Sequence, residues 1–243
     1  MIRRATAVVV LLAGATGATA CESTADKSAQ IAREGKRAVQ DAGTLAIRRS
    51  TELRVARAVV IRGTGGAVAA AVEVRNRGAQ AQRDVPVLID VRDAKGGSLY
   101  KNDAIGLQPA LQRLASVKAH KTSWWVNDQV TVASSPRSVT ARVGAAPPAA
   151  AVPDVTLKDV HFASDATGRY LTGTVVNPST AILRNVPVFA VALHGARVVA
   201  AGRALVPKLP AAGARKPIHF RRFFVGDPRG ARVALTVAPT VTS

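Results

Sequence analysis

Short runs in which apolar and polar residues alternate, separated by turn residues, fill the chain from about residue 52 onward. In the clearest run, Val85, Val87, Ile89 and Val91 occupy every second position. Successive side chains of a strand point to opposite faces, so a period of two is typical of a strand with one buried face. The many short runs and the turn residues between them predict an all-β chain of antiparallel strands.

One pattern occurs twice, about one hundred residues apart. Asn76 stands ten residues before Pro86, the proline of a Val-Pro-Val segment, and Asn177 stands ten residues before Pro187 in a second Val-Pro-Val. Such internal similarity indicates two copies of one structural unit. We therefore expect two tandem antiparallel β-sandwich domains, repeat 1 at residues 52–144 and repeat 2 at residues 154–239.

The alternation in repeat 2 changes phase within its third run. It passes from Val188 to Phe189, Val191 and Leu193, one position out of step with repeat 1. One extra residue in a strand is accommodated by a β-bulge. We therefore expect a bulge after Val188.

Residues 145–153 consist of Ala, Pro and one Val. Proline favours extended backbone and cannot donate a backbone hydrogen bond, so we expect a semi-rigid linker through which no strand passes. Residues 240–243 are expected to form a short tail.

The first twenty residues have the pattern of a secretory signal. Arg3 and Arg4 precede a short apolar run and a small-residue tail that ends at Ala20. The apolar run is too short to span a bilayer, which needs about 20 residues. We expect residues 1–20 to be a signal peptide and the mature protein to be exported without a membrane-spanning helix.

Cys21 is the only cysteine and directly follows that tail. In this placement the chain resembles a bacterial lipoprotein, although Ala18 stands where such signals usually have Leu. The resemblance implies a lipid on Cys21 and anchoring on the extracytoplasmic face. Ordinary cleavage after Ala20 is the alternative, and it would leave a secreted protein with a free Cys21 thiol. We expect residues 21–51 to form the lipidated N-terminus and a short helical or disordered stalk.

The formal net charge of +19 is extreme for 243 residues. Such a charge favours anionic partners, here anionic wall polymers or acidic lipids. The basic residues are scattered, and no nucleic-acid-binding module or stacking aromatic platform accompanies them, so nucleic acid is not an expected partner.

The repeated order Val-x-Asn, a ten-residue gap, Val-Pro-Val, then a glycine turn and a further strand resembles the FxLYD-type domain. In this chain Ile89-Asp90-Val91-Arg92-Asp93 stands at the naming motif of repeat 1, and Val191-Ala192-Leu193-His194-Gly195 stands there in repeat 2. The resemblance covers both repeats. It implies tandem immunoglobulin-like sandwiches, often found in exported bacterial lipoproteins, and carries no catalytic residues over.

Residue types that support catalysis are present without the usual context. Asp159 and His161 share a strand face, with Ser164 close behind, but the serine lacks a nucleophile-elbow motif. The four histidines show no metal-ligand spacing, and no glycine-rich segment fits a phosphate loop, so we expect no metal and no cofactor. A hydrolase is the most distant alternative. Asp93 is expected to cap the turn at residues 95–97.

Aromatic pairs mark a possible binding surface in each repeat. Adjacent strand residues face opposite ways, so one side chain of Trp124-Trp125 is expected in the core and the other exposed. Phe223-Phe224 holds the related place in repeat 2, beside Arg221 and Arg222. The alternative is that these aromatics serve only the core and a covered edge.

Together these observations predict a non-catalytic, lipid-anchored binding or scaffold protein of the bacterial cell envelope. It would contact an envelope protein or component through loops, strand edges and exposed aromatics. The second hypothesis is a cationic protein, anchored or secreted, that binds anionic wall polymers or acidic lipids. Ionic strength distinguishes the two, because binding by charge weakens steeply with salt.

Overall fold

The structure is a computed structural model that describes residues 45–165, 168–211, 213–220 and 224–239. Residues 42–243 form one compact unit. Within the described part, the regular elements are fifteen strands and two short 3-10 turns, η1 (Thr64–Gly66) and η2 (Pro109–Leu111). The strands are β1 (Leu53–Arg62), β2 (Val68–Asn76), β3 (Ala81–Arg92), β4 (Ser98–Lys101), β5 (Arg113–Val117), β6 (Thr122–Asn127), β7 (Ser138–Val143), β8 (Pro148–Ala149), β9 (Thr156–Asp165), β10 (Gly168–Asn177), β11 (Leu183–His194), β12 (Arg197–Leu209), β13 (Ala214–His219), β14 (Phe224–Gly226) and β15 (Arg232–Val237).

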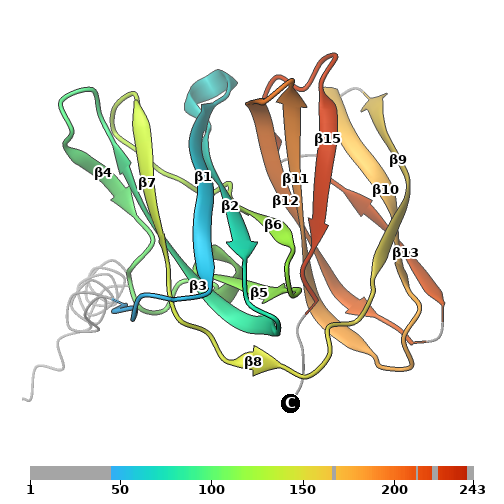
Figure 1. The fold of residues 1–243 in the computed structure, drawn as a ribbon. Coiled ribbons are helices and arrows are strands. Elements are labelled where there is room, and N and C mark those ends of the chain that lie inside the picture. Colours follow the sequence, from blue (N-terminus) through green and yellow to red (C-terminus); the bar gives the residue numbers. More distant parts are fainter. Residues whose placement is uncertain (1–44, 166–167, 212, 221–223, 240–243) are drawn as a thin grey trace, which may run out of the picture. The chain divides into compact units, whose positions relative to one another are not determined.

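Four antiparallel sheets make two sandwiches (Figure 1). In the first, a sheet in the order β1-β2-β6 faces a sheet built around β3, which pairs with β4, β5, β7 and β8. In the second, a sheet in the order β13-β10-β9 faces one in the order β14-β12-β11-β15. The predicted all-β sandwich fold is confirmed.

The motif asparagines make the same contacts in both sandwiches. Asn76 and Asn177 are fully buried at the ends of β2 and β10. The side-chain amide of Asn76 donates to the carbonyl of Gln80 at 2.8 Å, and that of Asn177 donates to the carbonyl of Ala181 at 2.7 Å. Each Oδ1 also accepts the backbone amide two residues on. The asparagine therefore fastens the turn that leads to the Val-Pro-Val strand.

One long strand of the second sandwich corresponds to two short strands of the first. β12 pairs along β11 from Arg197 to Leu209, whereas β4 and β5 pair with the two halves of β3. In the interruption, the buried side chain of Asn102 accepts from the amide of Ile89 at 2.7 Å and donates to the carbonyl of Val87 at 2.8 Å. A side-chain amide thus supplies both hydrogen bonds that a paired strand would give to β3.

The predicted bulge after Val188 is wrong. β11 pairs with β12 in unbroken register from Val186 to Ala192, and the register shift lies between Ala192 and Leu193. Repeat 1 has its shift at the equivalent place, between Val91 and Arg92. The bulge is therefore common to both repeats, and no extra residue is inserted into β11.

The change of phase has a different cause, because β11 is buried on both faces. Val186, Val188 and Ala190 belong to the core of the second sandwich. Phe189, Val191 and Leu193 belong to a cluster that includes residues of the first sandwich. A strand covered on both sides shows a nearly continuous apolar run rather than simple alternation.

The apolar contact between the two sandwiches, called the sandwich interface below, joins outward-facing residues of both. β6 contacts β11, β12 and β15, and β1 contacts β12 and β14. The apolar residues that meet in this cluster include Ala69, Ala71, Trp124 and Val126 of the first sandwich and Phe189, Val191, Leu193, Ala201 and Val225 of the second.

The segments outside the two repeats also contact the first sandwich. Pro148 and Ala149 form β8, which pairs with Gln82 and Ala81 of β3. The expectation that no strand passes through residues 145–153 is therefore wrong. Proline lacks a backbone N–H but keeps its carbonyl, so it can pair at the edge of a sheet. Here the carbonyl of Pro147 accepts a hydrogen bond from the backbone amide of Arg83. Before repeat 1, the backbone amide of Leu45 donates to the carbonyl of Asp103, and Arg49 forms an isolated antiparallel β-bridge with Gly144. The described residues of the expected stalk therefore lie along the first sandwich.

Candidate functional site

Both tryptophans of the predicted binding surface are buried. Trp125 is completely buried and its indole N–H donates to the carbonyl of Ala110 at 3.0 Å. Trp124 faces the opposite way, as expected, yet it is only 7% exposed because the second sandwich covers it. Its backbone amide donates to the hydroxyl of Thr236 at 2.9 Å, and the Arg57 guanidinium lies 5.8 Å from its ring centroid. The prediction that one tryptophan is exposed is wrong, because the partner surface belongs to the same chain.

Phe224 is half-buried and packs against the core of the second sandwich. Its ring lies edge-on to Phe162 and Phe220, with centroids 6.2 and 6.3 Å away. The other members of the predicted surface in this repeat, Arg221, Arg222 and Phe223, lie outside the described residues. The prediction that Phe223-Phe224 holds the place of the tryptophan pair is wrong: by strand register Ile218 and Pro217 of β13 hold the places of Trp125 and Trp124, and Phe224 lies on β14 of the other sheet.

A charged pair crosses the sandwich interface beside the apolar cluster. Asp128, directly after β6, has a fully buried side chain, and its Oδ1 lies 3.4 Å from Nε of Arg203 on β12. The backbone amide of Arg203 donates to Oδ2 of Asp128 at 3.2 Å. Burial raises the pKa of Asp128 to about 6, with Arg203 opposing the shift. The Oδ1 atom is buried, and none of the described residues donates a hydrogen bond to it.

The interface opens into a groove of about 370 Å³, called the interface groove below. Its apolar lining includes Pro109 and Ala115 from the first sandwich and Pro187 and Leu205 from the second. Leu205 is 52% exposed, one of the few large apolar side chains in the described part that are open to solvent. Arg113, Arg203 and Asp84 also line the groove, and Arg203 is already paired with Asp128, so the partly apolar surface lies beside charges of both signs.

Backbone conformation shapes two walls of the interface groove. Asp84 and Asn185 stand at equivalent positions before the two Val-Pro-Val segments and have φ values of 51° and 49°. A positive φ is uncommon outside glycine and is best tolerated by Asn and Asp. Sequence reasoning missed this groove, because its walls come from two repeats whose contact the sequence pattern does not reveal.

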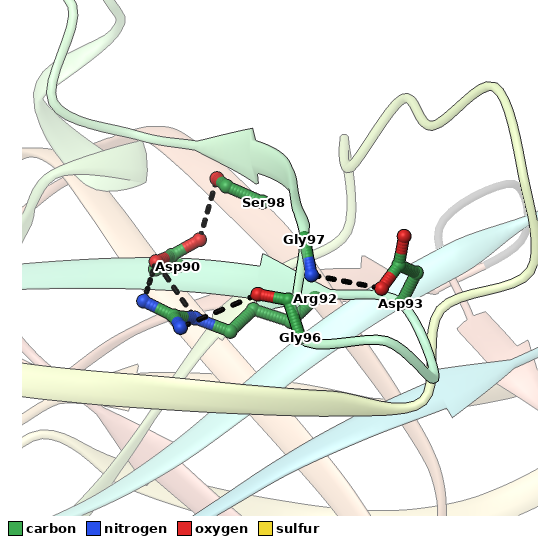
Figure 2. Close-up of polar contacts among 6 residues, drawn as sticks. All are labelled: Asp90, Arg92, Asp93, Gly96, Gly97 and Ser98. Atoms are coloured by element: carbon green, nitrogen blue, oxygen red, sulfur yellow. Dashed lines mark hydrogen bonds and ion pairs between the residues drawn. The ribbon is translucent and has the colours of Figure 1, made fainter.

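The polar residues around the β3–β4 turn serve the hairpin itself (Figure 2). Oδ1 of Asp93 accepts the amides of Lys95 and Gly97, both at 2.8 Å, which confirms the predicted turn cap. Asp90 accepts from Arg92 and from the Ser98 hydroxyl at 2.6 Å. Burial acts to raise the pKa of Asp90, but these hydrogen bonds and the Arg92 charge outweigh it and lower the pKa below 3.8.

Two histidines of the described part, His161 and His194, contact main-chain groups. Nδ1 of His161 donates to the backbone carbonyl of Asp159 at 2.8 Å, and Nε2 of His194 donates to the carbonyl of Arg229 at 2.8 Å. Asp159 has a φ of 54° at the bulge of β9. Among the described residues, no group of three or more His, Cys, Asp and Glu could hold a metal ion.

The residues predicted to anchor the protein, with Cys21 at their centre, lie outside the described part. Within the described ranges, no helix has the length and apolar character needed to cross a membrane.

Comparison with known proteins adds no family. No family model matches the chain, and no curated protein matches it. Among solved structures, red sea bream transglutaminase is similar over 92% of this chain and 34% of that chain, with 13% identity and a TM-score of 0.20. The chain thus spans about a third of that structure, and a likeness of this size says nothing about activity.

Proposed function

We propose that this chain is an exported, lipid-anchored protein of the bacterial cell envelope that acts as a non-catalytic binding or scaffold module, and that it resembles FxLYD-type proteins. The anchor is supported by the signal pattern of residues 1–20 and by the position of Cys21, the only cysteine, directly behind it. The scaffold role is supported by the sandwich interface, which holds the two sandwiches together through buried apolar residues.

The interface groove is the observation that carries the binding role. The core of a protein interface is apolar, arginine is enriched there, and binding hot spots lie in well-packed pockets. Leu205 and Pro187 supply the apolar part, and Arg113 supplies a cation, because Arg203 is paired with Asp128. A partner segment that carries both an apolar side chain and a carboxylate matches this arrangement.

Anchoring is tested by the mass of the mature N-terminal peptide from native membranes, with a Cys21→Ser variant in parallel. The proposal requires an acylated Cys21 and a variant that is released from the membrane. An unmodified Cys21 thiol in the mature protein would overturn the anchor and leave a secreted protein.

Binding through the groove is tested by placing a photo-crosslinking amino acid at Leu205 in the cell envelope. Ile182 is the matched control, because it is similarly exposed at 54% and does not line the groove. A discrete adduct at position 205 that is absent at position 182 supports the proposal. Equal labelling at both positions would show non-specific contact.

The second candidate function, polyanion binding, is favoured by the net charge of +19. Most of the energy would then come from many weak contacts that salt screens, since the Debye length falls from about 10 Å at 0.1 M to about 3 Å at 1 M. Retention on anionic wall polymer that is lost at high salt, together with an unlabelled groove, would favour this function over the first.

A further inference from the structure

A second groove, called the arginine groove below, lies in the first sandwich between β1 and β7. β1 is an edge strand of its sheet, β7 pairs only with β3 among the described strands, and the two contact each other across the open side of the sandwich (Figure 1). The groove has a volume of about 420 Å³, within the range of small-molecule sites. Its lining comprises Ile47, Arg49, Ser50, Leu53, Arg54, Val55, Ala141, Arg142 and Val143.

The floor of the arginine groove is apolar and continuous with the core. Val55 pairs with Val74 and Val143 pairs with Val87, and both partners are completely buried. Leu53 and Val143 themselves belong to the core cluster. An apolar ligand in this groove would therefore meet the inward-facing side of both sheets.

The rim of the arginine groove is basic. Arg54 on β1 and Arg142 on β7 alternate with these inward-facing residues, so one arginine from each sheet flanks the opening. Arg49 lies in the segment before β1, where it forms a β-bridge with Gly144. No acidic residue is among the described residues that line the groove. Within the described ranges, none of the three guanidinium groups has a carboxylate partner, and the nearby Glu52 accepts from Gln82 instead.

Repeat 2 provides an internal comparison. By strand register, Thr156 holds the place of Arg54, and Thr236 holds the place of Arg142. The hydroxyl of Thr236 accepts the backbone amide of Trp124 in the sandwich interface. The fold therefore does not require arginine at these two positions, and the basic rim is a property of the first sandwich alone.

We propose that the arginine groove binds an anionic amphiphile with a single acyl chain. The acyl chain would lie on the floor formed by Leu53, Val55 and Val143, and the anionic headgroup would pair with the arginines of the rim. Arginine binds carboxylate and phosphate groups through several hydrogen bonds at once, so either headgroup suits the site. The inference goes beyond the proposed function, because it does not depend on acylation of Cys21 or on the interface groove.

The test uses the full chain purified from the envelope and titrated calorimetrically with four monomeric probes. Myristate and myristoyl-lysophosphatidylglycerol represent the carboxylate and phosphate headgroups, myristoyl-lysophosphatidylcholine removes the net charge, and inorganic phosphate removes the chain. We expect saturable binding at one site per chain for at least one of the first two probes. The headgroup that binds more tightly identifies the source of the ligand.

The double variant Arg54→Thr/Arg142→Thr puts at the rim the threonines that repeat 2 has at the equivalent positions. It should weaken binding of the anionic probe by about tenfold or more. The control Arg184→Thr/Arg215→Thr makes the same change of charge at exposed positions outside the groove, and should change the affinity by less than about twofold. Denaturant unfolding of both variants verifies that they are folded.

Several results would overturn the inference. Equal affinity of the two double variants would place the binding elsewhere on the cationic surface. Equal binding of lysophosphatidylcholine would remove the role of charge, and equal binding of inorganic phosphate would remove the role of the apolar floor. A parallel titration with phosphatidylglycerol vesicles covers the remaining case: binding to the vesicles and to none of the four monomeric probes would indicate attachment to a membrane surface instead of occupation of the groove.

Discussion

Asp128 of the first sandwich and Arg203 of the second meet in the sandwich interface with Nε 3.4 Å from Oδ1. The carboxylate is buried, and the attraction of one arginine does not compensate for the lost solvation, so its pKa rises to about 6. The pair is therefore a place where protonation and folding are coupled.

Stability should fall as pH rises through the titration of Asp128. The folded-state pKa of about 6 lies above the ordinary value of 3.8, so between these values the folded state holds a proton that the unfolded state has released. Proton binding by the folded state means that rising pH lowers the free energy of unfolding, by on the order of 3 kcal/mol across the window. Urea unfolding of the wild type and Asp128→Asn at several pH values measures this difference. Parallel curves for the two proteins would contradict the assignment to Asp128.

The motif asparagines should be costly to replace. Asn76→Ala and Asn177→Ala each remove a buried amide from partly buried carbonyl groups, and a group left unsatisfied costs about 1–3 kcal/mol. We expect a loss of about 2–4 kcal/mol in chemical denaturation for each variant. Gln80→Ala is the control, because its exposed side chain is lost while the carbonyl that accepts from Asn76 stays. A loss below about 0.5 kcal/mol for either asparagine would show that water replaces the amide.

The sandwich interface should make the two sandwiches unfold together. Ala201 and Leu205 lie on the same face of β12, but Ala201 is completely buried in the interface and Leu205 is 52% exposed. Ala201→Arg places a charge in the interface and should lower the free energy of unfolding by about 3 kcal/mol or more. Leu205→Arg should change it by less than about 0.5 kcal/mol. Fluorescence of the two tryptophans and far-UV circular dichroism should give coincident transitions in the wild type and separate transitions in Ala201→Arg.

The β3–β4 hairpin should depend on the Asp93 cap. Asp93→Ala removes the acceptor for the amides of Lys95 and Gly97 and should cost about 1 kcal/mol. Asp93→Asn keeps an acceptor oxygen and should recover most of the loss. Hydrogen exchange of the Gly97 amide reports the same difference locally. Equal exchange rates in wild type and Asp93→Ala would indicate that the turn does not rely on the side chain.

The sequence is informative where a pattern reflects one local cause. Alternation over residues 85–91 predicts β3 because one face of that strand meets the core, and the spacing of Asn76 and Pro86 recurs with Asn177 and Pro187 because each asparagine fastens the same turn. These features suffice for the all-β sandwich fold.

The sequence is less informative where burial comes from the other repeat. A bulge is suggested by Phe189, Val191 and Leu193 when only one sandwich is considered, because their burial against the other sandwich is not expected. Trp124 is predicted to be exposed for the same reason. The interface groove and the arginine groove depend on which strands lie side by side, which alternation alone does not specify. The arginines of the rim could have been noticed only by comparing Arg54 and Arg142 with Thr156 and Thr236.

The two-sided burial of β11 bears on what happens when the chain is cut. Cleavage or truncation within residues 145–153 would separate the two repeats in the segment whose Ala and Pro composition predicts a linker. The C-terminal fragment would then expose Phe189, Val191 and Leu193 as an apolar strip along the middle of a sheet. Such strips promote self-association. Each half of this protein is therefore expected to be less soluble than the whole, and nicked molecules should appear as aggregates rather than as free single sandwiches.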